Sequence, residues 1–182
     1  MAKRTDYFLT ALTVIAWIIF IGLCIEAGGY LTNTIFTLFI NPEGAKKFWM
    51  QIDLSKLYQY NQSRYVTLTS IMVIIAVLKA WMFYYIVKIF YDKKVDLSRP
   101  FNEAMNRFIF KTAYLAMGIA FFSFWGAGFS RQLSQQGIQL PDTQQLKMGG
   151  ADVWLFMGVT LLVIAFIFKK GVEIQNENDL TV

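Results

Sequence analysis

Apolar residues in this chain are gathered into four long segments, at about residues 7–27, 66–91, 108–129 and 153–168. A helix rises about 1.5 Å per residue, so roughly 20 residues cross the apolar core of a bilayer. The segments lack the alternation of barrel strands, and a helix satisfies its own backbone in lipid. The pattern predicts an all-α integral membrane protein, a four-helix transmembrane bundle in which residues 1–182 form a single membrane domain.

The first connection, between the first two spans, continues the apolar pattern before it begins a helix. Residues 30–40 are too short to cross the membrane and return, which favours an interfacial or bundle-packed extension over a re-entrant segment. Asn41-Pro42-Glu43 then combines a capping side chain, a proline and an acid, the signature of a helix start. The segment it opens ends near Phe48 and Trp49, residue types that favour the membrane–water interface. We expect a short interfacial helix in this outer loop.

Composition and charge support the membrane class. The 182 residues are 56% hydrophobic and 16% charged, below the roughly 25% charged residues of soluble domains. The net charge of +5 would suit nucleic acid, but the basic residues flank the apolar spans, so direct nucleic-acid binding is not expected. The inner connection 92–107 is richer in Lys and Arg than the outer connection 130–151, which predicts both termini in the cytoplasm and a cytoplasmic tail at 169–182.

The residue inventory argues against an enzyme. The chain has one cysteine, Cys24, and no histidine, so it lacks an intrachain disulfide, a histidine-ligated metal or haem, and a Ser-His or Cys-His catalytic pair. It also lacks a phosphate-binding glycine loop. We expect no catalytic activity, no cofactor and no metal.

Two charged residues are the candidate intramembrane charges, Lys79 and Glu26, whereas Lys88 lies near the end of the second span. Lys79 lies near or past the middle of the second span, where a lysine costs at least a few kcal/mol. Glu26 lies near the predicted outer end of the first span, about 15 Å away along the axis. A direct pair is therefore not expected. Lys79 is either part of a transport or coupling site, or a lysine that snorkels or pairs inside the bundle.

The inner connection contains a second helix start. Ser98 can cap a helix, Pro100 suits its first turn, and Glu103 lies near its positive end. Phe101 and Met105 then begin a helical repeat of apolar positions that continues into the third span. Arg107 lies on the polar face of this predicted helix.

The carboxyl end carries the opposite charge. Its acids are Glu173, Glu177 and Asp179, interleaved with Ile174 and Leu180. The tail can fold back on the inner connection, with its acids near the basic residues Lys93, Lys94, Arg99 and Arg107. Exposed ion pairs contribute only about 0–1 kcal/mol each, so apolar contacts to Phe101 or Met105 would have to hold it. The alternatives are a solvated acidic tail and a docking surface for a cytosolic protein.

The runs LSRPFNEAMNRF and GVEIQNENDLTV resemble a bacterial four-span membrane family catalogued as domain of unknown function 2975. The resemblance covers nearly the whole chain and implies a place in the bacterial inner membrane. Many members are encoded beside a small helix-turn-helix regulator, which makes such a regulator the implied partner. The residues that match the family pattern include Pro100, Phe101, Gly171, Gln175, Glu177, Asp179, Leu180, Thr181 and Val182.

Three functions remain open at this point. The first is a non-enzymatic binding or signalling protein that engages a cytosolic partner through the inner connection and the tail. The second is a small transporter or channel, working as a homo-oligomer, and the third is an accessory subunit of a larger membrane complex. For the first, the candidate partner-binding residues are Pro100, Phe101, Asn102, Arg107, Glu173, Gln175, Glu177, Asp179 and Leu180.

Overall fold

The computed structural model describes residues 2–92 and 101–179, with side chains for residues 7–92 and 101–177. The long helices are α1 (Ala2–Phe39), α3 (Gln62–Tyr91), α4 (Glu103–Gln135) and α5 (Ala151–Asp179). The shorter elements are η1 (Pro42–Ala45), η2 (Trp49–Gln51) and α2 (Ser55–Tyr60), and no strand occurs in these parts of the chain. The 4 long helices are apolar and long enough to cross a membrane, which confirms the predicted all-α membrane fold.

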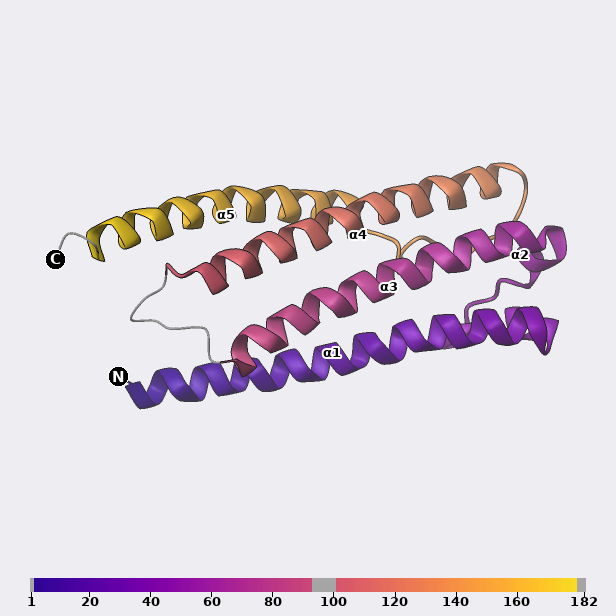
Figure 1. Ribbon diagram of the computed structural model, residues 1–182. Coiled ribbons are helices and arrows are strands. Elements are labelled where there is room, and N and C mark those ends of the chain that lie inside the picture. The colour runs from indigo at the N-terminus through magenta and orange to yellow at the C-terminus, as the bar shows by residue number, and fades with distance from the viewer. Residues whose placement is uncertain (1, 93–100, 180–182) are drawn as a thin grey trace.

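The long helices run antiparallel and lie side by side in chain order (Figure 1). Contacts join α1 to α3, α3 to α4 and α4 to α5. The start of α1 and the end of α5 lie at one end of the bundle, here called the terminal end. The opposite end, which holds η1, η2 and α2, is called the far end. An even number of crossings brings both termini to the same side.

The two outermost helices are the least buried. In the apolar stretches of α1 and α5, 6% and 11% of the residues are buried, compared with 44% in α3 and 39% in α4. The exposed residues of α1 include Ile15, Ile18 and Ile25. A water-soluble protein rarely exposes an apolar surface of this extent, so a lipid bilayer is the environment that these helices suit.

Helix α1 extends well beyond the predicted exit at residue 27. It passes through Gly28 and Gly29 and ends at Phe39, so residues 30–40 form the extension that was favoured, not a re-entrant segment. At Gly29 the ring of Trp49 from η2 lies so close that no Cβ would fit, whereas no atom lies within 4 Å of a Cβ built at Gly28. A side chain would therefore fit at Gly28, whereas the absence of one at Gly29 allows Trp49 to pack closely on α1.

The predicted first outer loop, between α1 and α3, begins as expected and then departs from a single helix. Asn41 Oδ1 accepts a hydrogen bond of 2.9 Å from the backbone N–H of Glu43 at the start of η1. The helical structure is divided between the short turns η1 and η2. Phe48, expected near the interface, is fully buried and stacks on Tyr30 with ring centroids 5.9 Å apart. Burying this aromatic ring anchors the loop on the bundle.

Helix α4 begins later than the sequence suggested. Its N-cap is Asn102, whose Oδ1 accepts a 2.8 Å hydrogen bond from the backbone N–H of Met105, with Glu103 in the first turn. The expected cap Ser98 and the expected first-turn Pro100 lie outside the described residues. The prediction that this helix continues into the third span is confirmed, because α4 is continuous to Gln135.

The predicted second outer loop, residues 136–150 in the structure, folds back along the bundle and contributes to its core. Leu146 and Met148 are fully buried, and Met148 lies against Gly126 of α4. Helix α5 therefore begins beside the middle of α4, where Gly158 lies against Met117. It then continues beyond the predicted span, so the predicted tail is helical as far as Asp179.

Candidate functional site

The described end of the predicted inner connection, residues 101–107, lies beside the predicted tail at the terminal end. Phe101, just before α4, packs on Phe168 of α5 with ring centroids 5.1 Å apart. One turn later on α5, a Cβ at Gly171 would come within 2.5 Å of Phe101 Cδ1, so glycine permits the close approach. Val172 is buried beside it. The tail was expected to fold back on the connection, and this is corrected: it extends α5 in a straight line along the start of α4.

A cavity of about 270 Å³ lies between these two helix segments. The residues of α5 that line the cavity recur at helical spacing, so they lie on the one face of α5 that faces α4. The buried Oδ1 of Asn106 has no hydrogen-bond partner within the described part of the chain. The lining residues are Glu103, Asn106, Arg107, Lys169, Val172, Glu173 and Asn176.

The two acids that line this cavity each pair with a base on their own helix. Arg107 Nη1 lies 3.5 Å from Glu103 Oε2, and Lys170 Nζ lies 3.0 Å from Glu173 Oε2. Glu173 and Arg107 line the same cavity. The acid of the tail and the base of the inner connection are therefore close to each other, while each forms its ion pair within its own helix. The expected basic residues Lys93, Lys94 and Arg99 lie outside the described residues.

The other predicted partner-binding residues divide into three groups. Asn102 has a structural role as the N-cap of α4. Gln175 is half-buried, and Glu177 and Ile174 are exposed; none of the three lines the cavity. Pro100 and Leu180, together with the side chain of Asp179, lie outside the described residues.

The intramembrane charges Lys79 and Glu26 lie at nearly the same depth. Phe20 of α1 contacts Tyr84 of α3, with ring centroids 6.1 Å apart. From that contact, Glu26 is six residues toward the far end and Lys79 is five, which is about 9 Å and about 7.5 Å. The expected 15 Å offset is wrong, because α1 does not end near residue 27.

Lys79 and Glu26 interact electrostatically, but each makes its short contacts with other groups. Lys79 Nζ donates a 3.2 Å hydrogen bond to the carbonyl oxygen of Lys147 and lies 5.7 Å from the centroid of the Trp154 ring. Glu26 Oε1 accepts a 3.2 Å hydrogen bond from the hydroxyl of Tyr30. Sequence reasoning missed Lys147 and Trp154, because only the folding of residues 136–150 and the packing of α5 bring them to Lys79. Lys79 is thus half-buried and contacts both the 136–150 loop and α5.

The described residues hold no group of three or more His, Cys, Asp or Glu side chains that could bind a metal ion. The terminal end has groups that suit binding: ion pairs on both helices, the unpartnered amide oxygen of Asn106 and the exposed side chain of Ile174.

Comparison with known proteins adds the family. No curated protein and no solved structure matches the chain. The sequence profile described as "Protein of unknown function (DUF2975)" matches residues 39–182, which span α3, α4, α5 and both outer loops. The chain therefore belongs to the DUF2975 family of membrane proteins.

Proposed function

We propose that this protein is a non-enzymatic membrane protein that binds a soluble protein partner at its terminal end. The observation that carries the proposal is the extension of α5 as one helix to Asp179, packed on Phe101 through Gly171. A packed helix presents its side chains in a fixed arrangement, which lowers the entropy lost on binding.

The exposed face of this extension suits a basic partner. Ile174 is 50% exposed and lies three residues before Glu177, so both project from one side of the helix. Glu173 lies at the edge of the same surface. An apolar side chain flanked by acids can fill a pocket while the acids complement basic groups around it.

The proposed partner is a cytosolic helix-turn-helix regulator. Its DNA-binding face would be basic, and acids on the membrane protein would compete with DNA phosphates for that face. The excess of Lys and Arg in the inner connection supports a cytoplasmic terminal end in a bacterial inner membrane. Capture of the regulator at the membrane would keep it from DNA.

Affinity purification of the full-length protein from its source cells tests this proposal. The test variant carries Glu173→Gln, Glu177→Gln and Asp179→Asn. The control carries Glu43→Gln, Asp53→Asn and Asp142→Asn, which change the net charge equally in the loops near the far end. We expect the wild type and the control to recover a helix-turn-helix protein. The test variant should recover at least about tenfold less of it, which corresponds to a loss of about 1.4 kcal/mol in binding free energy. Equal recovery by all three proteins would contradict the proposal.

A further inference from the structure

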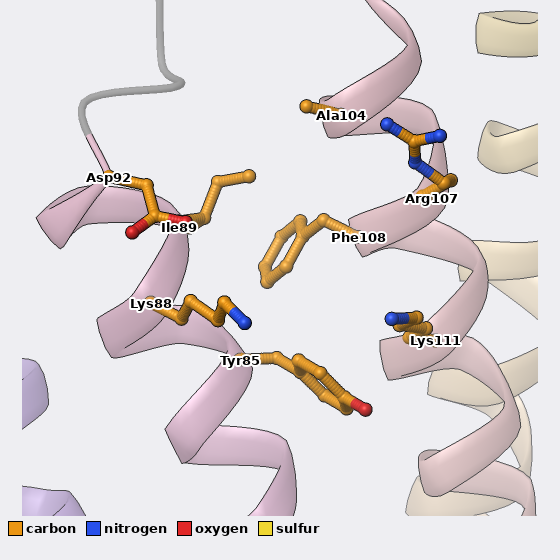
Figure 2. Close-up of a pocket in the computed structure, with 8 residues that line it drawn as sticks. All are labelled: Tyr85, Lys88, Ile89, Asp92, Ala104, Arg107, Phe108 and Lys111. Atoms are coloured by element: carbon orange, nitrogen blue, oxygen red, sulfur yellow. The ribbon is translucent and has the colours of Figure 1, made fainter.

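A second cavity lies at the terminal end between the end of α3 and the start of α4. Its volume is about 160 Å³, enough to hold several water molecules. In Figure 2, Lys88 of α3 and Lys111 of α4 extend into the space between the helices, with Tyr85 and Phe108 beside them. Arg107 lies at its rim, one turn of α4 from Lys111. The site is a small pocket with a cation on each wall.

The charges that line the cavity do not cancel. Asp92 is the acid among the lining residues, against three bases. Arg107 is paired with Glu103. Lys88 and Lys111 have no acidic partner within the described parts of the chain. Their ammonium groups lie instead over tyrosine rings, 5.8 Å from the Tyr84 centroid and 4.9 Å from the Tyr85 centroid. Among the described residues, three bases therefore share the cavity lining with one acid, Asp92.

The depth of the two lysines fits an anion at the membrane surface. Lys88 is three residues from the end of α3 and Lys111 eight residues from the start of α4, or about 5 Å and about 12 Å along the helices. Lysines near helix ends direct their ammonium groups toward the headgroup region. Ile89 and Phe108 give the pocket an apolar side, which suits the part of a lipid next to its phosphate.

From this geometry we infer that the cavity between α3 and α4 binds a phosphate group through Lys88 and Lys111. The phosphate belongs to an anionic phospholipid headgroup or to a soluble phosphate compound. Both sources present the same oxygen acceptors, and basic pockets between membrane helices recognise them through charge-assisted hydrogen bonds. The site is separate from the proposed partner-binding face of α5.

Two binding titrations of the full-length protein in neutral detergent test the inference and separate the sources. In one, phosphatidylglycerol is added and bound lipid is counted by native mass spectrometry, with phosphatidylcholine as the zwitterionic control. In the other, inorganic phosphate is added and binding is followed by calorimetry. Preferential binding of phosphatidylglycerol supports a lipid ligand, and binding of inorganic phosphate supports a soluble one.

The variants locate the site. Lys88→Gln with Lys111→Gln should weaken binding roughly 30-fold, and each single change about fivefold, for one surface cation each. The matched control, Lys46→Gln with Lys56→Gln, removes the same charge at the far end and should bind like the wild type. Arg107 is left unchanged because it also lines the α4–α5 cavity. If the wild type binds neither ligand, or if the two double variants bind equally, the inference is overturned.

Discussion

Lys79 shows how a single charge is accommodated deep in this protein. A lysine at the middle of a membrane helix costs about 2.5–3.5 kcal/mol or more. Against this, its hydrogen bond to the Lys147 carbonyl and its contact with the Trp154 ring each contribute on the order of 1–2 kcal/mol. Glu26 adds an opposite charge at the same depth. Residues far from Lys79 in the chain thus provide the polar contacts that its neighbours in the sequence do not provide.

The interaction of Glu26 with Lys79 predicts an energetic coupling between them. In a double-mutant cycle with Glu26→Gln and Lys79→Met, we expect a coupling free energy of at least about 0.5 kcal/mol. Detergent-induced unfolding followed by tryptophan fluorescence measures it. The control cycle pairs Glu26→Gln with Lys88→Met, nine residues or about 14 Å further along α3, and should give nearly zero. Equal couplings in both cycles would show that Glu26 acts on overall charge and not on Lys79.

At the scale of elements, the contact of α1 with η2 decides how the first outer loop is held. Paired glycines such as Gly28-Gly29 are typical of flexible backbone. In the structure α1 is helical through both, and Gly29 alone faces the ring of Trp49. The neighbouring stack of Phe48 on Tyr30 fixes the same loop on the same helix.

This difference predicts opposite effects of the same substitution at adjacent positions. Gly29→Ala forces a Cβ against Trp49 and should lower the free energy of unfolding by about 1–3 kcal/mol. Gly28→Ala meets no atom within 4 Å and should leave stability unchanged or raise it by up to about 1 kcal/mol, because alanine favours helix over glycine. Thermal unfolding of the two purified variants in one detergent compares them. Equal melting temperatures would show that the indole moves aside without cost.

At the scale of the whole molecule, the row of antiparallel helices places both termini at one end. The sequence of apolar and polar segments determined the number of crossings, because each apolar segment has to be buried in lipid. The excess of basic residues in the inner connection predicts that the terminal end lies in the cytoplasm.

Cysteine labelling tests that orientation. In a Cys24→Ser background, Lys46→Cys marks the far end and Glu177→Cys marks the terminal end, and both native side chains are exposed. A membrane-impermeant maleimide should label Lys46→Cys almost fully in intact cells and Glu177→Cys only at background level, because the bilayer separates them. After permeabilisation both should be labelled. Labelling of Glu177→Cys in intact cells would show that the terminal end lies outside the cytoplasm. It would then contradict the binding of a cytosolic partner at that end.

The sequence by itself determined the fold class, the four spans, the continuity of α4 and the helix start at Asn41, because apolar run length and capping chemistry act over a few neighbouring residues. It did not determine where α1 and α5 end, since packing against Trp49 and Phe101 stabilises helix beyond the apolar runs. Only the tertiary structure brought Glu26 level with Lys79, buried Leu146 and Met148 in a glutamine-rich loop, and placed Lys88 opposite Lys111. Each of these depends on the register between helices, which is set by side chains far apart in the chain.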